Sequence, residues 1–295
     1  AGAAVRESAD RVRSAIQETG FDFPRKRVVI NLAPADLRKQ GTGFDLPVAV
    51  GILAASGQIP DDLLADTVFL GELGLDGSVR DVRGALPIAL MAAATGARRL
   101  VLPVDCAAEA DVIDGLEVLA ADSLDSVCVW LTGGVPLPVA PPPVPDPPTP
   151  QPDLSEVRGQ ARARRALELA AAGGHNLLLV GPPGCGKSML AARLPSILPD
   201  LSFAEAIEIT RVHSVAGLVE PGHGLVRRRP FRAPHHSISN AGLLGNARLA
   251  PGELALAHNG VLFLDEVAEF NRNVLEQLRA PLEDRSLLLV RAAGS

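Results

Sequence analysis

Residues 1–132 alternate between helix-like and strand-like patterns of apolar and polar positions. Apolar side chains at helical spacing, or in longer buried runs, predict helices over 5–19, 44–57, 87–96 and 107–116. Short apolar runs predict strands over 27–32 and 98–103, and a pair of strands around a glycine turn within 67–79. This alternation predicts a mixed α/β domain at 1–132.

A proline-rich stretch follows this predicted domain. From Pro136 to Pro152, 10 of 17 residues are proline, and proline fixes φ and removes a backbone donor, which favours extended polyproline II. We interpret residues 133–153 as a semi-rigid linker between two domains. The alternative is a ligand for a proline-binding partner.

A second α/β pattern occupies residues 154–295. A helix is predicted over 155–174, with a start at Ser155 that resembles a capping box. Apolar runs at 175–180 and 260–266 predict buried strands, and the second run leads into a predicted helix over 269–284.

The composition narrows the class of protein without assigning a function. Hydrophobic residues make up 47% and charged residues 21%, which excludes wholesale disorder. The formal net charge of −6 excludes a strongly basic nucleic-acid module, so any DNA contact must come from a local patch. Cys106, Cys128 and Cys185 are too scattered for a disulfide framework or a zinc knuckle. No apolar run reaches the roughly 18 residues of a membrane span, so we expect a soluble, cytoplasmic protein with no membrane contact.

Residues 181–188 read GPPGCGKS and match the P-loop pattern G-x-x-x-x-G-K-[ST], between a predicted strand and a helical segment. Glycines let successive backbone N–H groups curl around phosphate oxygens. Lys187 is expected to reach the β- and γ-phosphates of ATP, and Ser188 to bind Mg²⁺. The residues predicted to contact the nucleotide are Gly181, Pro182, Pro183, Gly184, Cys185, Gly186, Lys187, Ser188 and Met189.

The second chemical signal is the pair Asp265–Glu266, which directly follows the apolar run Val261–Leu264. A strand would deliver Asp265 at its end, where the carboxylate can join Ser188 in holding Mg²⁺. Glu266 can polarise the attacking water. Glu266 and Lys187 are the predicted catalytic residues. The presence of the Asp265–Glu266 pair favours ATP hydrolysis over simple nucleotide storage.

Several longer strings make the sequence resemble one family, the magnesium-chelatase-related AAA+ ATPases of the ComM/YifB type. The strings in the second half are VRGQARARRALELAAAGGHNLLLVGPPGCGKSMLAARLPSILP, RPFRAPHHSISNAGLLGN, PGELALAHNGVLFLDEVAEF and LRAPLED. In the first half, VVINLAPADL, FDLPVAVGILAASGQIP and FLGELGLDGSVRDVRGALPIAL resemble that family's Lon-protease-like domain. The resemblance covers essentially the whole chain apart from the linker, and implies a degenerate Lon-like domain followed by an incomplete AAA+ domain.

The resemblance implies a hexameric ring that couples ATP hydrolysis to work. For the ComM/YifB type this work is branch migration of DNA during natural transformation and recombination. The alternative within enzymes is a magnesium-chelatase-type motor that drives metal insertion into a tetrapyrrole. A third interpretation treats the Lon-like domain as an interaction platform and the chain as a non-catalytic piece.

The Lon-like resemblance does not imply a peptidase. A Lon-type site needs a serine activated by a lysine. By similarity, Asp45 stands at or next to the serine position, and Leu86 and Ile88 stand at the two lysine positions. Because no lysine lies between Lys39 and Lys187, a Ser–Lys dyad cannot be built in this part of the domain.

Two further groups of residues, one of arginines and one of histidines, each have more than one possible role. Arg227, Arg228, Arg229 and Arg232 form the most basic short run in the chain, and either contact DNA phosphates or belong to a solvated loop or an inter-subunit contact. His235 and His236 are either metal ligands or part of a structural loop. The second reading is favoured because no Cys or carboxylate lies at ligand spacing.

We also expect the chain to be a fragment, because it lacks an initiator Met and opens almost directly into a helical pattern. The N-terminal part of the Lon-like domain, and the sensor strand, arginine finger and lid of the AAA+ domain, are expected to lie outside it. We therefore expect the 295 residues alone to be inactive as an ATPase. We also expect Leu177–Val180 and Val261–Leu264 to lack their central partner strand.

Overall fold

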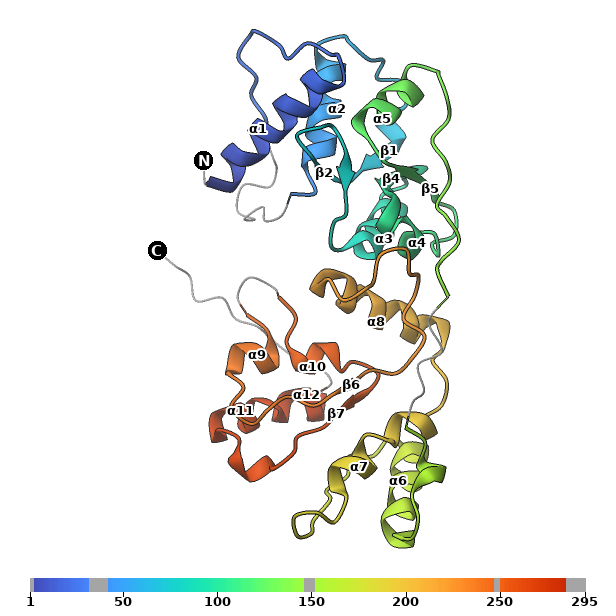
Figure 1. The fold of residues 1–295 in the computed structure, drawn as a ribbon, viewed down its shortest axis with the longest axis vertical. Coiled ribbons are helices and arrows are strands. Elements are labelled where there is room, and N and C mark those ends of the chain that lie inside the picture. Colours follow the sequence, from blue (N-terminus) through green and yellow to red (C-terminus); the bar gives the residue numbers. More distant parts are fainter. Residues whose placement is uncertain (1–2, 32–41, 146–151, 247–249, 285–295) are drawn as a thin grey trace. The chain divides into compact units, whose positions relative to one another are not determined.

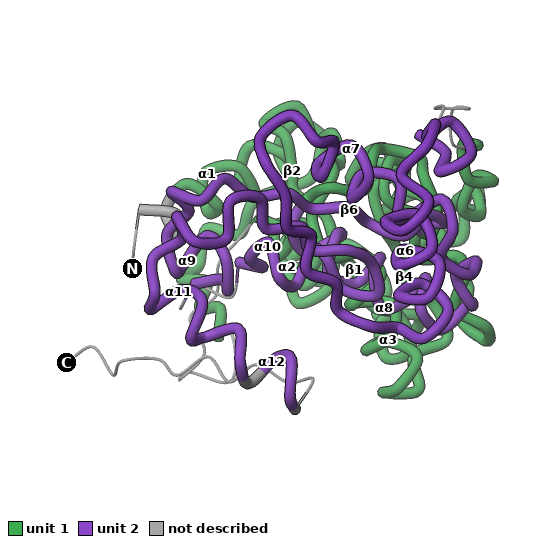
Figure 2. Tube along the Cα trace, turned by 90° about the horizontal axis from the view of Figure 1, so that it is seen from below, with its two compact units in different colours: residues 1–145, 217–225 green, residues 146–216, 226–295 purple. Residues whose placement is uncertain are grey.

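The structure is a computed structural model that describes residues 3–31, 42–145, 152–246 and 250–284 (Figure 1). The chain forms two compact units, which Figure 2 distinguishes by colour. Unit 1 contains residues 1–145 and 217–225, and unit 2 contains residues 146–216 and 226–295. Both units combine helices with parallel strand pairs, so the prediction of a mixed α/β chain is confirmed.

Unit 1 is built on a three-stranded parallel sheet in the order β1-β4-β5. Its strands are β1 (Thr67–Phe69), β4 (Arg99–Pro103) and β5 (Glu117–Ala121). Its helices are α1 (Ala3–Glu18), α2 (Asp45–Ala55), α3 (Ala85–Ala94), α4 (Val104–Ala110), α5 (Leu124–Leu131) and the 3₁₀ turn η1 (Leu64–Asp66).

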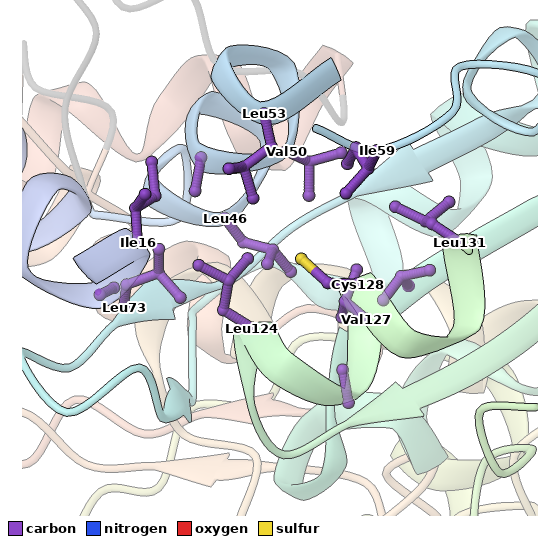
Figure 3. Packing of buried hydrophobic residues seen from close by; sticks show 14 of the residues in the cluster. Ile16, Leu46, Val50, Leu53, Ile59, Leu73, Leu124, Val127, Cys128 and Leu131 are labelled. Carbon is purple, nitrogen blue, oxygen red and sulfur yellow. The ribbon is translucent and has the colours of Figure 1, made fainter. Parts of the chain in front are cut away.

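Helices cover both faces of this sheet. Because strand side chains alternate in direction, Val101 points into one apolar cluster while Leu100 and Leu102 point into the other. The first cluster, drawn in Figure 3, gathers side chains from α1, α2 and α5, with Ile16, Leu46 and Val127 among them. The second cluster gathers side chains from α3 and α4. Burial of each large aliphatic side chain contributes about 1.5–3 kcal/mol, so these two layers hold the sheet in place.

A short antiparallel hairpin pairs β2 (Glu72–Leu73) with β3 (Val79–Arg80). Gly77 in its turn has φ of +81°, a conformation that side chains with a Cβ rarely adopt. The predicted pair of strands around a glycine turn is therefore confirmed.

The first part of the proline-rich stretch belongs to unit 1 and runs along β5. The N–H of Ala120 donates to the carbonyl of Pro138 (2.8 Å), and the N–H of Ala140 donates to that of Val118 (2.9 Å). Residues 146–151 lie outside the described residues. Residues 217–225 join the same unit, since the N–H of Gly222 donates to the carbonyl of Asp105.

Unit 2 contains short elements around two small apolar clusters. Its helices are α6 (Ala161–Gly173), α7 (Lys187–Ala191), α8 (Phe203–Ala216), α9 (Asn240–Leu244), α10 (Glu253–Leu256), α11 (Arg272–Gln277) and α12 (Arg279–Asp284). Its 3₁₀ turns are η2 (Leu154–Glu156), η3 (Leu194–Ile197) and η4 (Val267–Glu269). Strand β6 (Phe231–Arg232) pairs in parallel with β7 (Val261–Leu262).

Two predicted strands are wrong. Residues 27–31 and 175–180 are extended or irregular, and neither pairs with a strand in the described part of the chain. Residue 32, the end of the first predicted strand, lies outside the described residues. An apolar run becomes a strand only where a neighbour takes up its backbone hydrogen bonds. The side chains of Leu178 and Val180 are accordingly 73% and 87% exposed.

Three predicted helices differ in their bounds. The helix predicted from Ser155 begins at Ala161, because Gly159 and Gln160 both have positive φ and interrupt the helical path. The helix predicted over 269–284 is divided into α11 and α12, and the one over 107–116 ends at Ala110. None of the helices in the described ranges is both long and apolar enough to cross a bilayer.

A buried ion pair fixes α2 to α1. The Asp45 side chain is 1% exposed and accepts hydrogen bonds from Arg11 Nε (2.7 Å), Ser8 Oγ (2.5 Å) and the N–H of Leu73 (3.4 Å). The hydrogen bond to Asp45 raises the pKa of Arg11 above its ordinary value. Asp45 therefore joins two helices and the hairpin. Leu86 is fully buried, and its N–H donates to Glu109 Oε1 (2.8 Å).

Replacing Asp45 by alanine leaves the Arg11 guanidinium buried without its main counter-charge. We expect Asp45→Ala to lower the free energy of unfolding of unit 1 by about 3–5 kcal/mol. Trp130, the single tryptophan, packs on Phe69 in the first apolar cluster, so its fluorescence during urea titration follows this unit.

The matched control is Arg98→Ala, which removes an exposed ion pair of unit 1 with Asp66 at 3.8 Å. It should cost less than about 1 kcal/mol. Equal midpoints for Asp45→Ala and the wild type would show that the ion pair does not stabilise the unit.

Candidate nucleotide-binding site

Two glycines shape the backbone of the loop before α7. Gly184 and Gly186 have φ of +76° and +86°, which glycine adopts without steric cost. These two positions turn the chain around the space enclosed by Gly181–Gly186. Gly181–Gly184, Ser188 and Met189 are exposed, and Cys185, Gly186 and Lys187 are half-buried. The loop is therefore open to a ligand.

Lys187, the first residue of α7, folds its side chain back over the loop. Its Nζ donates to the carbonyl oxygens of Gly181 (3.0 Å) and Pro182 (3.1 Å) and lies 3.9 Å from Cys185 Sγ. The ammonium group thus sits at the concave side of the loop, with neutral acceptors as its partners. Phosphate oxygens are stronger partners for this cation than carbonyl oxygens, because charge-assisted hydrogen bonds are roughly twice as strong.

Ser188 and Asp265 meet although 77 residues separate them. The Ser188 hydroxyl donates to Asp265 Oδ2 at 2.7 Å. The other carboxylate oxygen, Oδ1, accepts the N–H of Glu266 at 3.0 Å. A hydroxyl and a carboxylate side by side are the hard oxygen ligands that Mg²⁺ prefers, so this donor pair fits the ion.

Glu266 follows in an unusual conformation. It has φ of +51° and ψ of +50°, which is uncommon for a residue with a side chain. Its carboxylate is 70% exposed and lies 3.8 Å from Nδ1 of His236. No spacing in the sequence relates residue 236 to residue 266, so sequence reasoning did not place them together.

A cavity of about 370 Å³ opens beside the loop. Its lining is mostly apolar, and includes Leu179, Val180 and Leu190 together with Lys187. The Gln160 side chain also lines it and donates from Nε2 to the carbonyl of Cys185 at 3.3 Å. Cavities of this size and character accept small organic ligands. Sequence reasoning missed Gln160 because it placed this residue inside a continuous helix.

Two of the four arginines predicted to contact DNA are held by carboxylates of unit 2. Arg229 Nη1 lies 2.9 Å from Glu205 Oε1, and its side chain is 13% exposed. Hydrogen bonds from Arg229 and Ser202 lower the pKa of Glu205 to about 2. Arg232 binds Glu253 through Nε (2.6 Å) and Nη2 (2.7 Å). Arg227 and Arg228 are exposed, and DNA contact by this run stays a prediction.

No group of three His, Cys, Asp or Glu side chains that could hold a metal ion is found within the described ranges. His235 Nδ1 lies 2.8 Å from Ser237 Oγ, and the two histidine rings lie 4.0 Å apart.

Two family profiles match the chain. Residues 153–295 match "Magnesium chelatase, subunit ChlI", and residues 1–106 match "Subunit ChlI of Mg-chelatase". Together the two profiles cover both the P-loop and the buried Asp45.

Curated relatives align over almost the whole chain. YifB of Escherichia coli, described as uncharacterized, is 46% identical over 97% of this chain and 56% of its own length. The competence protein ComM of Haemophilus influenzae is 45% identical over 98% of this chain and 57% of its own length. Lon protease 2 of Bacillus subtilis is 28% identical over 45% of this chain and 26% of its own length. The chain spans a little over half the length of YifB and ComM. On these matches, the chain belongs to the magnesium-chelatase-related ComM/YifB family.

Proposed function

We propose that residues 154–295 are the AAA+ part of an ATPase that binds ATP and Mg²⁺ at the loop Gly181–Ser188 and hydrolyses ATP with Glu266. The observation that carries the proposal is the 2.7 Å hydrogen bond between Ser188 and Asp265, which unites the loop with the acidic pair. The adjacent cavity supports it, because it offers an apolar wall beside the phosphate loop for the rest of the nucleotide.

Each residue has a distinct task in this proposal. The backbone N–H groups of the loop bind phosphate oxygens, and Lys187 exchanges its two carbonyl partners for the β- and γ-phosphates. Ser188 and Asp265 would hold Mg²⁺, which when bound neutralises charge on the phosphates. Glu266 orients the attacking water and accepts its proton. Pro182, Pro183, Cys185 and Met189 shape the loop and its surroundings.

For the whole protein we propose a hexameric, cytoplasmic motor that acts on DNA. Residues 1–132 would be a degenerate Lon-like domain without peptidase activity. Residues 133–153, whose first part runs along β5, would be the linker to the second domain. The match to a competence protein supports a role on DNA. The description of both profiles favours a second candidate, a chelatase-type motor for metal insertion into a tetrapyrrole. A non-catalytic interaction role is the third.

Lys187→Ala removes the only side-chain cation of the P-loop. We expect at least about a tenfold loss of affinity for a fluorescent ATP analogue, because charge-assisted hydrogen bonds contribute about 1.5–3 kcal/mol each. Hydrolysis by the intact protein should disappear. The control Arg165→Ala removes an exposed cation on α6 and should change neither quantity. Unchanged hydrolysis in Lys187→Ala would refute the site.

Glu266→Gln keeps the size of the side chain and removes its basicity. ATP affinity should persist, whereas turnover should fall by about 10²–10⁴-fold, the contribution of a general base. Glu269→Gln, an exposed carboxylate three residues further on, is the matched control. Stoichiometric retention of radiolabelled ATP after gel filtration measures the trapped state. Normal turnover by Glu266→Gln would mean that another group activates the water.

The DNA and chelatase candidates differ in what stimulates hydrolysis. If the motor acts on DNA through the basic run, single- or double-stranded DNA should raise the ATPase rate of the intact protein. The double variant Arg227→Ala/Arg228→Ala should lose that stimulation at a salt concentration where Arg272→Ala retains it. The reason is that each lost contact between an arginine and a DNA phosphate weakens DNA binding. Stimulation by a porphyrin and not by DNA would instead favour the chelatase candidate.

A further inference from the structure

The two histidines that end the RPFRAPHH segment have no task in the proposal above, yet His236 lies beside Glu266. The His236 ring lies beside the Glu266 carboxylate, with Nδ1 at 3.8 Å from Oε2. We propose that His236 is a positioning residue for Glu266, and that its Nδ1–H directs the carboxylate toward the attacking water. The inference rests on the proposed ATPase function.

The ring of His236 is itself held on two sides. The His235 ring packs against it at 4.0 Å with an interplanar angle of 36°, and Phe270 meets it edge-on at 6.4 Å and 77°. Phe270 is buried in the apolar cluster that includes Leu243 and Val274. His235 is in turn tied to Ser237 by its Nδ1. A ring fixed by a core phenylalanine and a tethered neighbour presents its nitrogen in a constant direction.

Glu266, by contrast, has little else to fix its side chain. The carboxylate is 70% exposed, and its backbone is in the left-handed region, directly after the Asp265 that binds Ser188. An exposed, rotatable carboxylate spends most of its time away from any one water. A single directed N–H contact restricts it to the productive rotamers, and at 3.8 Å a small rotation of either side chain completes the hydrogen bond. This is the entropic contribution that positioning makes to a rate.

The competing explanation is that His236 only fills space beside Phe270. The two roles need different parts of the ring. Packing needs an aromatic plane, whereas positioning needs an N–H at the place of Nδ1. His236→Phe keeps the plane and removes the N–H. His236→Asn removes the plane but puts an amide N–H close to the position of Nδ1, while the amide of His236→Gln reaches the position of Nε2 instead.

The test is steady-state ATPase kinetics of the intact protein. We expect His236→Phe to lower kcat by about tenfold or more with KM for ATP unchanged within about twofold, because only positioning is lost. His236→Asn should recover most of the wild-type kcat, and His236→Gln should not. His258→Ala is the matched control, since it removes a histidine 3.0 Å from a different carboxylate, that of Glu208. It should keep the wild-type kcat.

A double-mutant cycle shows whether His236 acts through Glu266. In the Glu266→Gln background, His236→Phe should cause no further loss of kcat, because the group that it positions is gone. Additive losses would overturn the inference. So would a wild-type kcat for His236→Phe, or a rise of KM without a fall of kcat, in a protein whose hydrolysis depends on Lys187. If the wild type shows no Lys187-dependent hydrolysis, the proposed function fails and this inference fails with it.

Discussion

The hydrogen bond between Ser188 and Asp265 joins two separately packed parts of unit 2. Leu154, Val157, Leu167 and Leu190 form one small cluster on the side of the loop, and a second cluster around Leu243 and Val274 lies on the side of the acidic pair. The two-stranded sheet of β6 and β7 belongs to the second side. Neither cluster is large, and this exposed hydrogen bond is a polar contact between the two sides. The proposed Mg²⁺ ligands therefore come from two separately packed parts of the unit.

The parts of the chain that the sequence predicts well are those whose determinants are local. Helices α1, α2 and α3 follow from apolar spacing, because a helix satisfies its own backbone hydrogen bonds. The P-loop is equally local, since its shape depends on glycines within eight residues. For these elements, the pattern along the chain contains nearly all of the relevant physics.

The predictions that failed concern contacts between residues far apart in the chain, which the pattern of apolar and polar positions does not reveal. Residues 175–180 have the composition of a strand, but strand formation depends on a neighbour that is absent from the described residues. The left-handed Gln160, just before the late start of the predicted helix at Ala161, donates to the carbonyl of Cys185, a contact 25 residues away. His236 and Glu266 are 30 positions apart and meet only through the fold. Likewise, the arginine run looks like four available charges, but Glu205 and Glu253 neutralise two of them.

The buried Asp45 also bears on how this fold can change over evolutionary time. If its position descends from that of a nucleophilic serine, the exchange brought in a negative charge that Arg11, Ser8 and the N–H of Leu73 now surround. A single reversion to serine would restore the hydroxyl but remove the main counter-charge of the Arg11 guanidinium. Recovery of the ancestral chemistry would require coordinated changes at Asp45, Arg11 and the sites of Leu86 and Ile88. The ion pair therefore makes a one-step return to a serine at this position unfavourable.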